Sequence, residues 1–127
     1  MSYLLDTTLL LDFAHGRDSA IALVDALFNQ SEPLYTCAVV TCESLTGGDD
    51  LERAAIRGVL DALEFVALSS AGARHAAESR RARGAECAAR SVADALIGAL
   101  AWSLDATVVT RNPADFERQG VPVLTYA

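Results

Sequence analysis

The sequence contains no lysine, and all ten of its positive residues are arginines. It also contains neither the GxxxxGK pattern of a P-loop nor the GxGxxG pattern of a dinucleotide-binding turn. The missing glycine patterns argue against both kinds of nucleotide site. The missing lysine argues against aspartyl-phosphate enzymes and response-regulator receivers, because both classes generally need a lysine to neutralise the phosphoryl group.

Cysteine is scarce, and Cys37, Cys42 and Cys87 form an odd set without a CxxC pattern. Such residues are expected to be reduced, mostly buried thiols. A structural zinc site needs four ligands, and the only histidines, His15 and His75, lie far from the cysteines in the sequence. The pattern therefore favours free thiols over a zinc site.

The sequence also lacks a hydrophobic run that could cross a bilayer, because the longest, residues 93–104, contains Asp94 and Trp102. No basic stretch precedes the first apolar residues, which argues against a secretory signal, and we expect a cytoplasmic protein. The chain has 127 residues, of which 52% are hydrophobic and 21% charged, and it contains no linker or repeat. We therefore expect residues 1–127 to form a single domain.

The net charge of −7 is unusual for a nucleic-acid enzyme, for which a basic surface is typical. Half of the arginines nevertheless fall in one stretch, at Arg74, Arg80, Arg81, Arg83 and Arg90. Only two acids, Glu78 and Glu86, interrupt that stretch. It has two interpretations: a solvated helix face, or a patch that follows phosphates or binds a partner.

Five short apolar or β-branched runs predict strands at residues 3–5, 33–36, 65–68, 107–110 and 121–124. Apolar residues at helical spacing fill the segments between them. This alternation predicts βαβ units, and hence an α/β fold with a parallel sheet covered by helices on both faces. In such a sheet the ligand site lies beyond the carboxyl ends of the strands, where the strand order reverses. Functional residues should therefore follow strands.

Several residues predict where the helices begin or end. Thr7, Thr8 and Thr36 are plausible helix caps, and Asp49 is expected to open a helix. Gly84 is expected to break a helix, and Ser91 to begin a strongly apolar one.

Acids and one amide follow the predicted strands, and each has a structural alternative when taken alone. Asp6, which ends the first strand, could cap a helix. Asp94 could form a capping box with the serine three residues before it. Glu43, on the helix after the second strand, could be a solvated residue, and Asp115, which with Asn112 follows the fourth strand, could cap a short turn.

Taken together, these residues point to one site at the expected edge of the sheet. Carboxylates gathered there repel one another unless a cation compensates. Oxygen ligands without cysteine or histidine indicate a hard ion, Mg²⁺ or Mn²⁺. Such an ion polarises a phosphodiester and lowers the pKa of a bound water, so the sequence predicts metal-assisted phosphodiester hydrolysis.

Four segments in order resemble the PIN-domain family, and specifically its VapC-type toxin ribonucleases of type II toxin–antitoxin systems. They are residues 4–10 (LLDTTLL), 41–47 (TCESLTG), 93–99 (ADALIGA) and 109–116 (VTRNPADF). The resemblance implies a PIN-like three-layer α/β fold, with a twisted parallel sheet of four to five strands flanked by helices. It also implies Mg²⁺- or Mn²⁺-dependent endoribonuclease activity on RNA, a homodimer, and a cognate antitoxin that blocks the active site.

Carried over by position, the resemblance also implies roles for single residues. The catalytic acids would be Asp6, Glu43, Asp94 and Asp115, and the pocket would be lined by Thr110, Arg111 and Asn112. The metal ligands would be Asp6 and Asp94, while Glu43 would orient water or a second ion. The sequence departs from the family at Thr8, where asparagine is common, and at Asn112, where some members have an acid.

Two other functions fit part of this sequence pattern. An acid after the first strand also fits the haloacid-dehalogenase type, but that type needs a second acid at the position of Thr8. A PIN-like domain with a weak site could instead act only by binding protein partners. Loss of metal-dependent RNA cleavage in an Asp6→Asn variant would separate an enzyme from such a scaffold. Exposed apolar residues on the first two helices are the expected dimer or antitoxin surface.

Overall fold

Five parallel strands form one sheet in the order β3-β2-β1-β4-β5. The strands are β1 (Ser2–Leu5), β2 (Leu34–Thr36), β3 (Glu64–Phe65), β4 (Ala106–Val109) and β5 (Val123–Leu124). The chain moves outward from β1 through β2 and β3, and then returns to the opposite side of β1 to add β4 and β5. The expected parallel sheet is thus confirmed, and its strand order reverses between β1 and β4.

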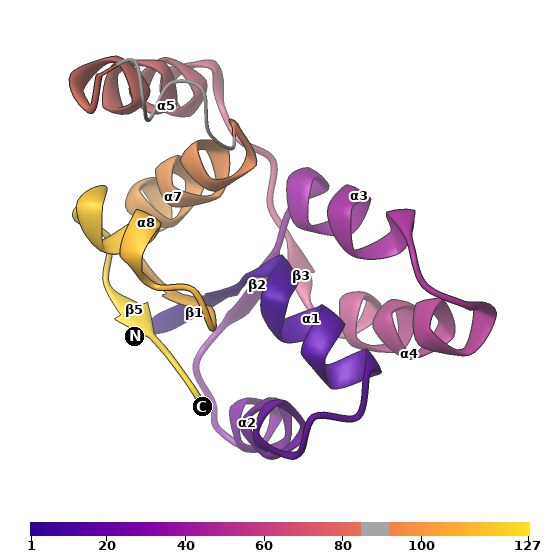
Figure 1. The fold of residues 1–127 in the computed structure, drawn as a ribbon. Coiled ribbons are helices and arrows are strands. Elements are labelled where there is room, and N and C mark those ends of the chain that lie inside the picture. Colours follow the sequence, from indigo (N-terminus) through magenta and orange to yellow (C-terminus); the bar gives the residue numbers. More distant parts are fainter. Residues whose placement is uncertain (85–91) are drawn as a thin grey trace.

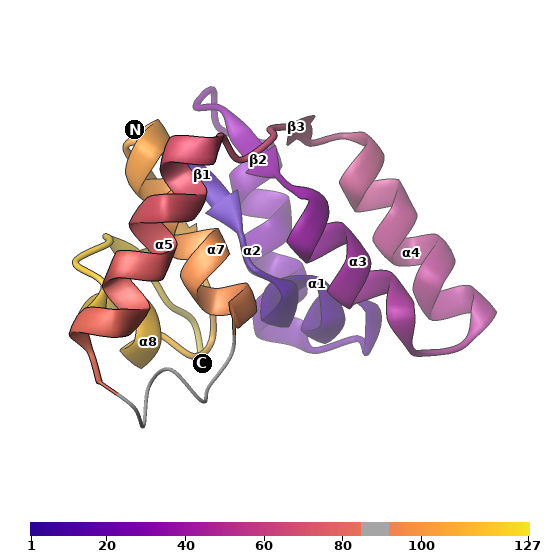
Figure 2. The ribbon, with the colours of Figure 1, turned by 90° about the horizontal axis from the view of Figure 1, so that it is seen from above.

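Helices cover both faces of this sheet. They are α1 (Thr7–Ala14), α2 (Asp18–Phe28), α3 (Ala38–Thr46), α4 (Asp50–Asp61), α5 (Ser70–Ala82), α7 (Val92–Leu104) and α8 (Ala114–Arg118). Figure 1 shows α7 and α8 on one side of the sheet and α1 on the other. Seen from above in Figure 2, α5 lies along α7, on which it packs. The three layers are those of the expected α/β fold.

The computed structural model describes residues 1–84 and 92–127. The predicted thiol at Cys87, the end of the arginine stretch at Arg90 and the helix start at Ser91 lie outside the described residues. Within them, Cys37 is a buried free thiol and Cys42 an exposed one. In the same ranges, none of the helices has the length and apolar character needed to span a membrane.

The two central strands are buried almost completely, which fixes the edge of the sheet where they end. All four residues of β4 are buried, and Leu4 and Leu5 of β1 are fully buried. Such continuous apolar runs are typical of parallel strands that are covered on both faces. Leu5 pairs with Val109, so the residues that follow them on the two strands leave the sheet side by side.

Some helix boundaries differ from those predicted. Asp49 opens α4 as expected, through a capping box with Glu52. Thr36 is the last residue of β2 rather than a cap, because the backbone stays extended through Cys37, which precedes α3. The predicted strand at 65–68 is shorter than expected, since β3 is an outer strand with only one neighbour and its Phe65 is exposed.

Gly58, on α4, provides a test of this packing. A methyl group built on Gly58 meets no atom within 4 Å, whereas one on Gly98 of α7 overlaps the side-chain amide of Gln119. We expect Gly58→Ala to raise the free energy of unfolding by about 0.5–1 kcal/mol, because alanine favours the helix more than glycine does. Gly98→Ala should lower it, because Gln119 must move. Urea unfolding of both variants measures the difference, and a destabilised Gly58→Ala protein would contradict this account of α4.

Candidate functional site

Asp6 lies at the carboxyl end of β1, where the strand order reverses. Only 4% of its surface is exposed. It occupies the residue before α1, but its side chain makes no capping hydrogen bond, so a helix cap does not explain the carboxylate. Its Oδ2 atom instead accepts hydrogen bonds from the hydroxyl of Thr110 at 2.7 Å and from the hydroxyl of Thr8 at 3.2 Å. Asp6 is therefore oriented by two threonines.

The two threonine hydroxyls are oriented in turn by backbone amides. The N–H of Arg111 donates to Thr8 Oγ1, and the N–H of Asn112 donates to Thr110 Oγ1, each at 3.1 Å. Because both hydroxyls accept from an amide, their protons are available for Asp6. The turn after β4 thus determines how the Asp6 carboxylate is held.

The structure brings the other predicted acids to the same edge. Glu43, on α3, is exposed, and its Oε1 atom accepts a hydrogen bond from the Thr7 hydroxyl at 2.9 Å. Asp94 lies in the first turn of α7 and shares a side-chain hydrogen bond with Asp115, in the first turn of α8. Asp6 and Glu43 both lie close enough to Asp94 to raise its pKa.

Mutual repulsion and burial shape the electrostatics of this acid cluster, which consists of Asp6, Glu43, Asp94 and Asp115. Burial raises the pKa of Asp94 to about 6, with further contributions from Asp6, from the shared bond and charge of Asp115, and from Glu43. Burial also raises the pKa of Asp6, although its threonine hydrogen bonds oppose the change. The cluster therefore favours the uptake of positive charge.

The predicted pocket residues behave differently from one another. Thr110 is fully buried, and its hydroxyl donates a hydrogen bond to Asp6. Asn112 is exposed and contributes its backbone amide. The Arg111 side chain binds Asp12 on α1, with Nε 2.7 Å from Oδ2 and a second bond of 3.3 Å to Oδ1. A pocket role for Arg111 and Asn112 stays a prediction.

Sequence reasoning did not anticipate the functions of Thr7, Thr8 and Asp12. The two threonines looked like helix caps, yet α1 begins at Thr7 and both hydroxyls bond to carboxylates. The available signal was a pair of hydroxyl residues directly after an acid at a strand end. Asp12 gave no such signal, because its partners lie 99 and 114 residues away in the chain.

The arginine stretch is only partly a positive surface. Arg74 and Arg81 are exposed on α5, and Glu78 lies between them around the same shallow hollow. Near the start of this helix, His75 stacks on the exposed Trp102 of α7, with ring centroids 4.0 Å apart. A solvated face and a patch that binds phosphates or a partner both stay predictions for this stretch.

The acid cluster suits a hard divalent cation. Within residues 1–84 and 92–127, no three acidic, histidine or cysteine side chains already form a group that could hold a metal ion. Mg²⁺ does not need such a cage, because it usually keeps several waters and takes one or two carboxylates from the protein. The cluster offers only oxygen ligands, and the raised pKa values of Asp6 and Asp94 show that it would gain from a cation. The donor set therefore fits Mg²⁺ or Mn²⁺.

Asp94→Asn tests the electrostatics of the cluster without any activity assay. The folded pKa of about 6 exceeds the ordinary value of 3.8, so ionising Asp94 costs stability as the pH rises through that interval. In metal-free protein we expect the variant to be more stable than the wild type at pH 7.5 by roughly 1 kcal/mol, with no gain at pH 3.5.

Thermal unfolding at both pH values measures this difference, and Asp61→Asn, which changes an exposed acid of α4, is the matched control. Added Mg²⁺ should stabilise the wild type more than the variant. Equal stability of the wild type and Asp94→Asn at pH 7.5 without metal would contradict the repulsion described here.

Comparisons with known proteins place this chain in a family. The model of the PIN domain family matches residues 3–121. No curated protein sequence matches the chain. Solved structures of VapBC and VapC proteins share its fold at low sequence identity, and three of them are described below.

The first is VapBC2 from Rickettsia felis bound to a DNA fragment from its promoter, with a TM-score of 0.78, 18% identity and full coverage of both chains. DNA-bound VapBC from Salmonella typhimurium gives a TM-score of 0.77 at 20% identity and 98% coverage of each chain. VapC20 from Mycobacterium tuberculosis, described as a Sarcin-Ricin loop cleaving toxin, gives 0.72 at 18% identity, covering 94% of this chain and 95% of that one. The family match spans nearly the whole sequence, and the chain belongs to the PIN domain family.

Proposed function

We propose that the chain is a metal-dependent endoribonuclease toxin that hydrolyses RNA phosphodiester bonds and is neutralised by a cognate antitoxin. The observation that carries this proposal is the acid cluster at the reversal of strand order. Family membership and the fold of VapC toxins support it. One related structure is described as a toxin that cleaves the Sarcin-Ricin loop, which is consistent with the same class of reaction.

Each acid has a role that its surroundings support. Asp6 and Asp94 would hold Mg²⁺ or Mn²⁺. When bound, the ion polarises the phosphodiester and lowers the pKa of a bound water. The Thr7 hydroxyl orients the Glu43 carboxylate, and Glu43 is exposed to solvent. Glu43 could therefore orient the attacking water and accept its proton. Asp115 shares a hydrogen bond with Asp94 and thereby helps to orient that ligand.

The bound cation also bears on how an acidic protein approaches RNA. With a net charge of −7, the chain as a whole repels a polyanion. A divalent ion at the acid cluster reverses that repulsion locally, at the place where the phosphate must bind. We therefore expect RNA binding, as well as cleavage, to require the metal.

A cleavage assay on total cellular RNA tests the proposal. Purified, partner-free protein should produce discrete fragments with Mg²⁺ or Mn²⁺ and none with EDTA. Asp6→Asn and Asp94→Asn should each lower the rate by at least about 100-fold, because each removes a proposed metal ligand. Asp61→Asn should cleave like the wild type. An inert wild-type protein, shown to be free of antitoxin and supplied with either metal, would leave only the alternative of a binding module.

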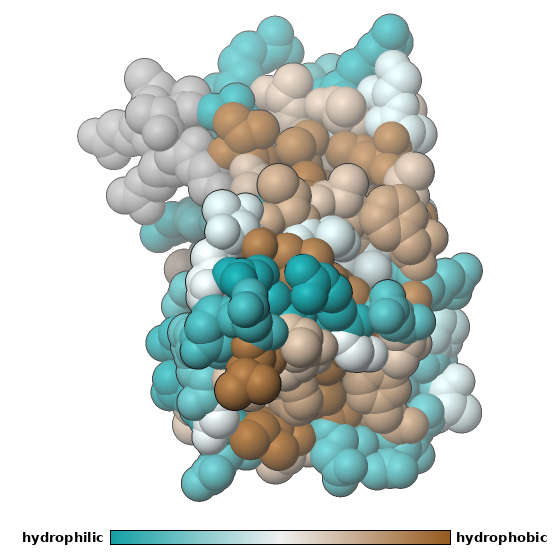
Figure 3. All heavy atoms as spheres, turned by 90° about the vertical axis from the view of Figure 1, so that its right-hand side faces the viewer, coloured by the Kyte–Doolittle hydropathy of each residue, from teal (hydrophilic) through white to brown (hydrophobic). Residues whose placement is uncertain are grey.

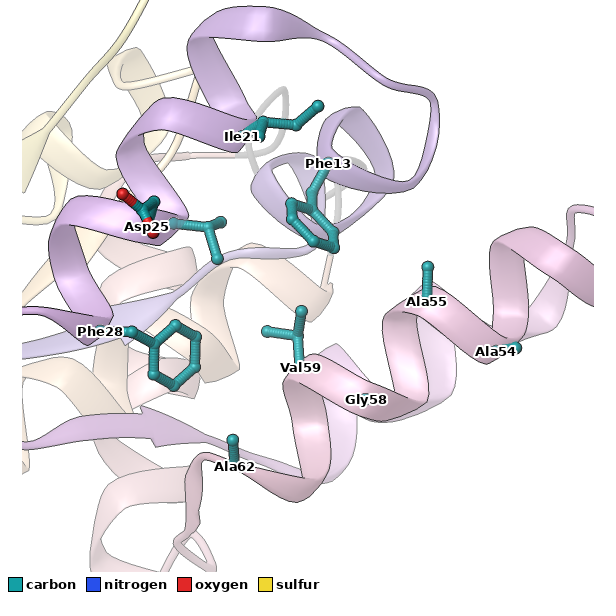
Figure 4. Close-up of a pocket in the computed structure, with 10 residues that line it drawn as sticks. Phe13, Ile21, Asp25, Phe28, Ala54, Ala55, Gly58, Val59 and Ala62 are labelled. Carbon is teal, nitrogen blue, oxygen red and sulfur yellow. The ribbon is translucent and has the colours of Figure 1, made fainter.

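An apolar groove that none of the four cluster acids lines supports the antitoxin part of the proposal. It has a volume of about 550 Å³ and is formed by α1, α2 and α4. Its lining includes Phe13, Ile21, Phe28, Gly58 and Val59. Figure 4 shows Phe13, Phe28 and Val59 converging on the groove from three helices. Figure 3 shows apolar side chains on this face of the molecule both above and below a hydrophilic band.

We assign this groove to the antitoxin. Ile21 and Phe28 are about 40% exposed, at 41% and 40%, although both are large apolar residues. An apolar surface of this kind is typical of a protein-binding site, and a groove between helices suits the apolar face of a partner helix. The similar structures include VapBC toxin–antitoxin complexes, which is consistent with a partner of this class.

A larger side chain at Gly58 tests the assignment, because a substituent there points into open space. Gly58→Leu should fill the groove without unfolding α4, and the protein that inhibits and co-purifies with the wild type should no longer bind. Ala22→Leu, on the exposed side of α2 away from the groove, should bind it normally. The test is inhibition of RNA cleavage by the added partner. If the partner fully inhibits Gly58→Leu, the antitoxin binds elsewhere. If Gly58→Leu instead loses self-association, the groove binds a second copy of this chain.

A further inference from the structure

Asp12 is a buried carboxylate that lies outside the acid cluster. Only 7% of its surface is exposed, and it lies on α1 one turn after Thr8. Both of its oxygens accept hydrogen bonds from the Arg111 guanidinium, and Oδ2 also accepts one from the Tyr126 hydroxyl at 2.6 Å. Burial acts to raise the pKa of Asp12, but the bonds from Tyr126 and Arg111 outweigh it and lower the pKa.

These three residues join three distant parts of the chain. Asp12 comes from α1, Arg111 from the turn after β4, and Tyr126 from the tail that follows β5. The Asp12 side chain is 9% exposed and that of Arg111 39%, so removal of the arginine would leave a buried carboxylate without its charge partner. The pair therefore holds its elements in one arrangement. Arg111 and Tyr126 both lie outside helices and strands, so their contacts with Asp12 fix segments that have no regular secondary structure.

A series of hydrogen bonds connects Arg111 to Asp6. Thr8 and Asp12 lie four residues apart, and therefore on the same side of α1. Arg111 meets both of them: its backbone N–H donates to Thr8, while its side chain binds Asp12. The next amide, that of Asn112, holds the Thr110 hydroxyl that donates to Asp6.

We propose that Asp12, Arg111 and Tyr126 form a clamp that positions the turn after β4, so that its backbone amides keep the Thr8 and Thr110 hydroxyls on Asp6. They are positioning residues and act through the threonines. The catalytic consequence of the clamp rests on the proposed function, whereas its effect on the turn does not. In metal sites, partners that orient a ligand typically contribute about 10-fold to 100-fold to affinity or activity.

Two conservative variants test the clamp. Tyr126→Phe removes one hydroxyl, and Arg111→Lys keeps the charge but loses the two-point contact with Asp12. For Arg111→Lys we expect kcat to fall about 10-fold to 100-fold, and for Tyr126→Phe about 3-fold to 10-fold, with KM for the same RNA unchanged within about 2-fold. In the double variant the losses should be less than multiplicative, because both changes loosen the same turn.

Two further measurements need neither RNA nor activity. Calorimetry with Mn²⁺ alone should show weaker binding in Arg111→Lys, by about 10-fold. Amide hydrogen exchange should show faster exchange at Arg111 and Asn112 in both variants than in the wild type, while the core strands keep their protection. Arg53→Lys, which changes an arginine that bonds to Asp50 and the Gly47 carbonyl near the start of α4, is the control and should match the wild type.

Failure of the clamp and failure of the proposed function give different results. If the wild type cleaves RNA but both variants keep its kcat, Mn²⁺ affinity and amide protection, the clamp is overturned. A raised KM in Arg111→Lys together with a normal Tyr126→Phe protein would also overturn it, because Arg111 would then contact RNA directly. If the wild type is inert, the proposed function fails, and the exchange and Mn²⁺ measurements still decide whether the clamp exists.

Discussion

The parallel pairing of β1 with β4 is the constraint on which the rest of the site depends. Leu5 and Val109 are opposite each other, and the Asp6 amide donates to the Val109 carbonyl at 3.0 Å. Residues 102 to 104 positions apart in the sequence thus become neighbours, and Asp6 meets Thr110 directly. Because the strand order reverses at this pair, helices leave the sheet in opposite directions and the edge between them stays open. A ligand site forms there as a consequence of topology.

The four carboxyl groups of the acid cluster lie close together at this open edge of the sheet. Asp94 keeps its proton up to a pH of about 6, because ionisation among the other acids is costly. Threonine hydroxyls and backbone amides reduce the cost at Asp6 without supplying a positive charge. Arg118 pairs with Asp115 at 3.1 Å, whereas the charge of Arg111 is paired with Asp12, outside the acid cluster. The arrangement leaves a cation from solution as the natural complement.

The sequence predicted the fold class, the strands and the acid cluster because each depends on local patterns. Short apolar runs mark β1 and β4, and the rule that sites follow strands selects Asp6 and Asp115 from the acids. What it missed depends on contacts between distant residues. Thr8 could not be distinguished from a helix cap until β4 placed an amide beside it, and the link between Asp12 and Tyr126 spans 114 positions. β3 was predicted too long, since the apolar run at 65–68 does not reveal an edge position.

The tail that carries Tyr126 has a consequence for the order in which the molecule forms. Its hydroxyl reaches back to the first helix, and the carbonyl of Ala127 accepts bonds from Arg17 and Ser19 at the start of α2. Contacts between such remote segments require the closure of very long loops and form late in folding. On the ribosome, the segment with Asp6 is made first and the segment that steadies its surroundings is made more than a hundred residues later. A nascent chain would therefore carry Asp6 well before it could hold that carboxylate in position.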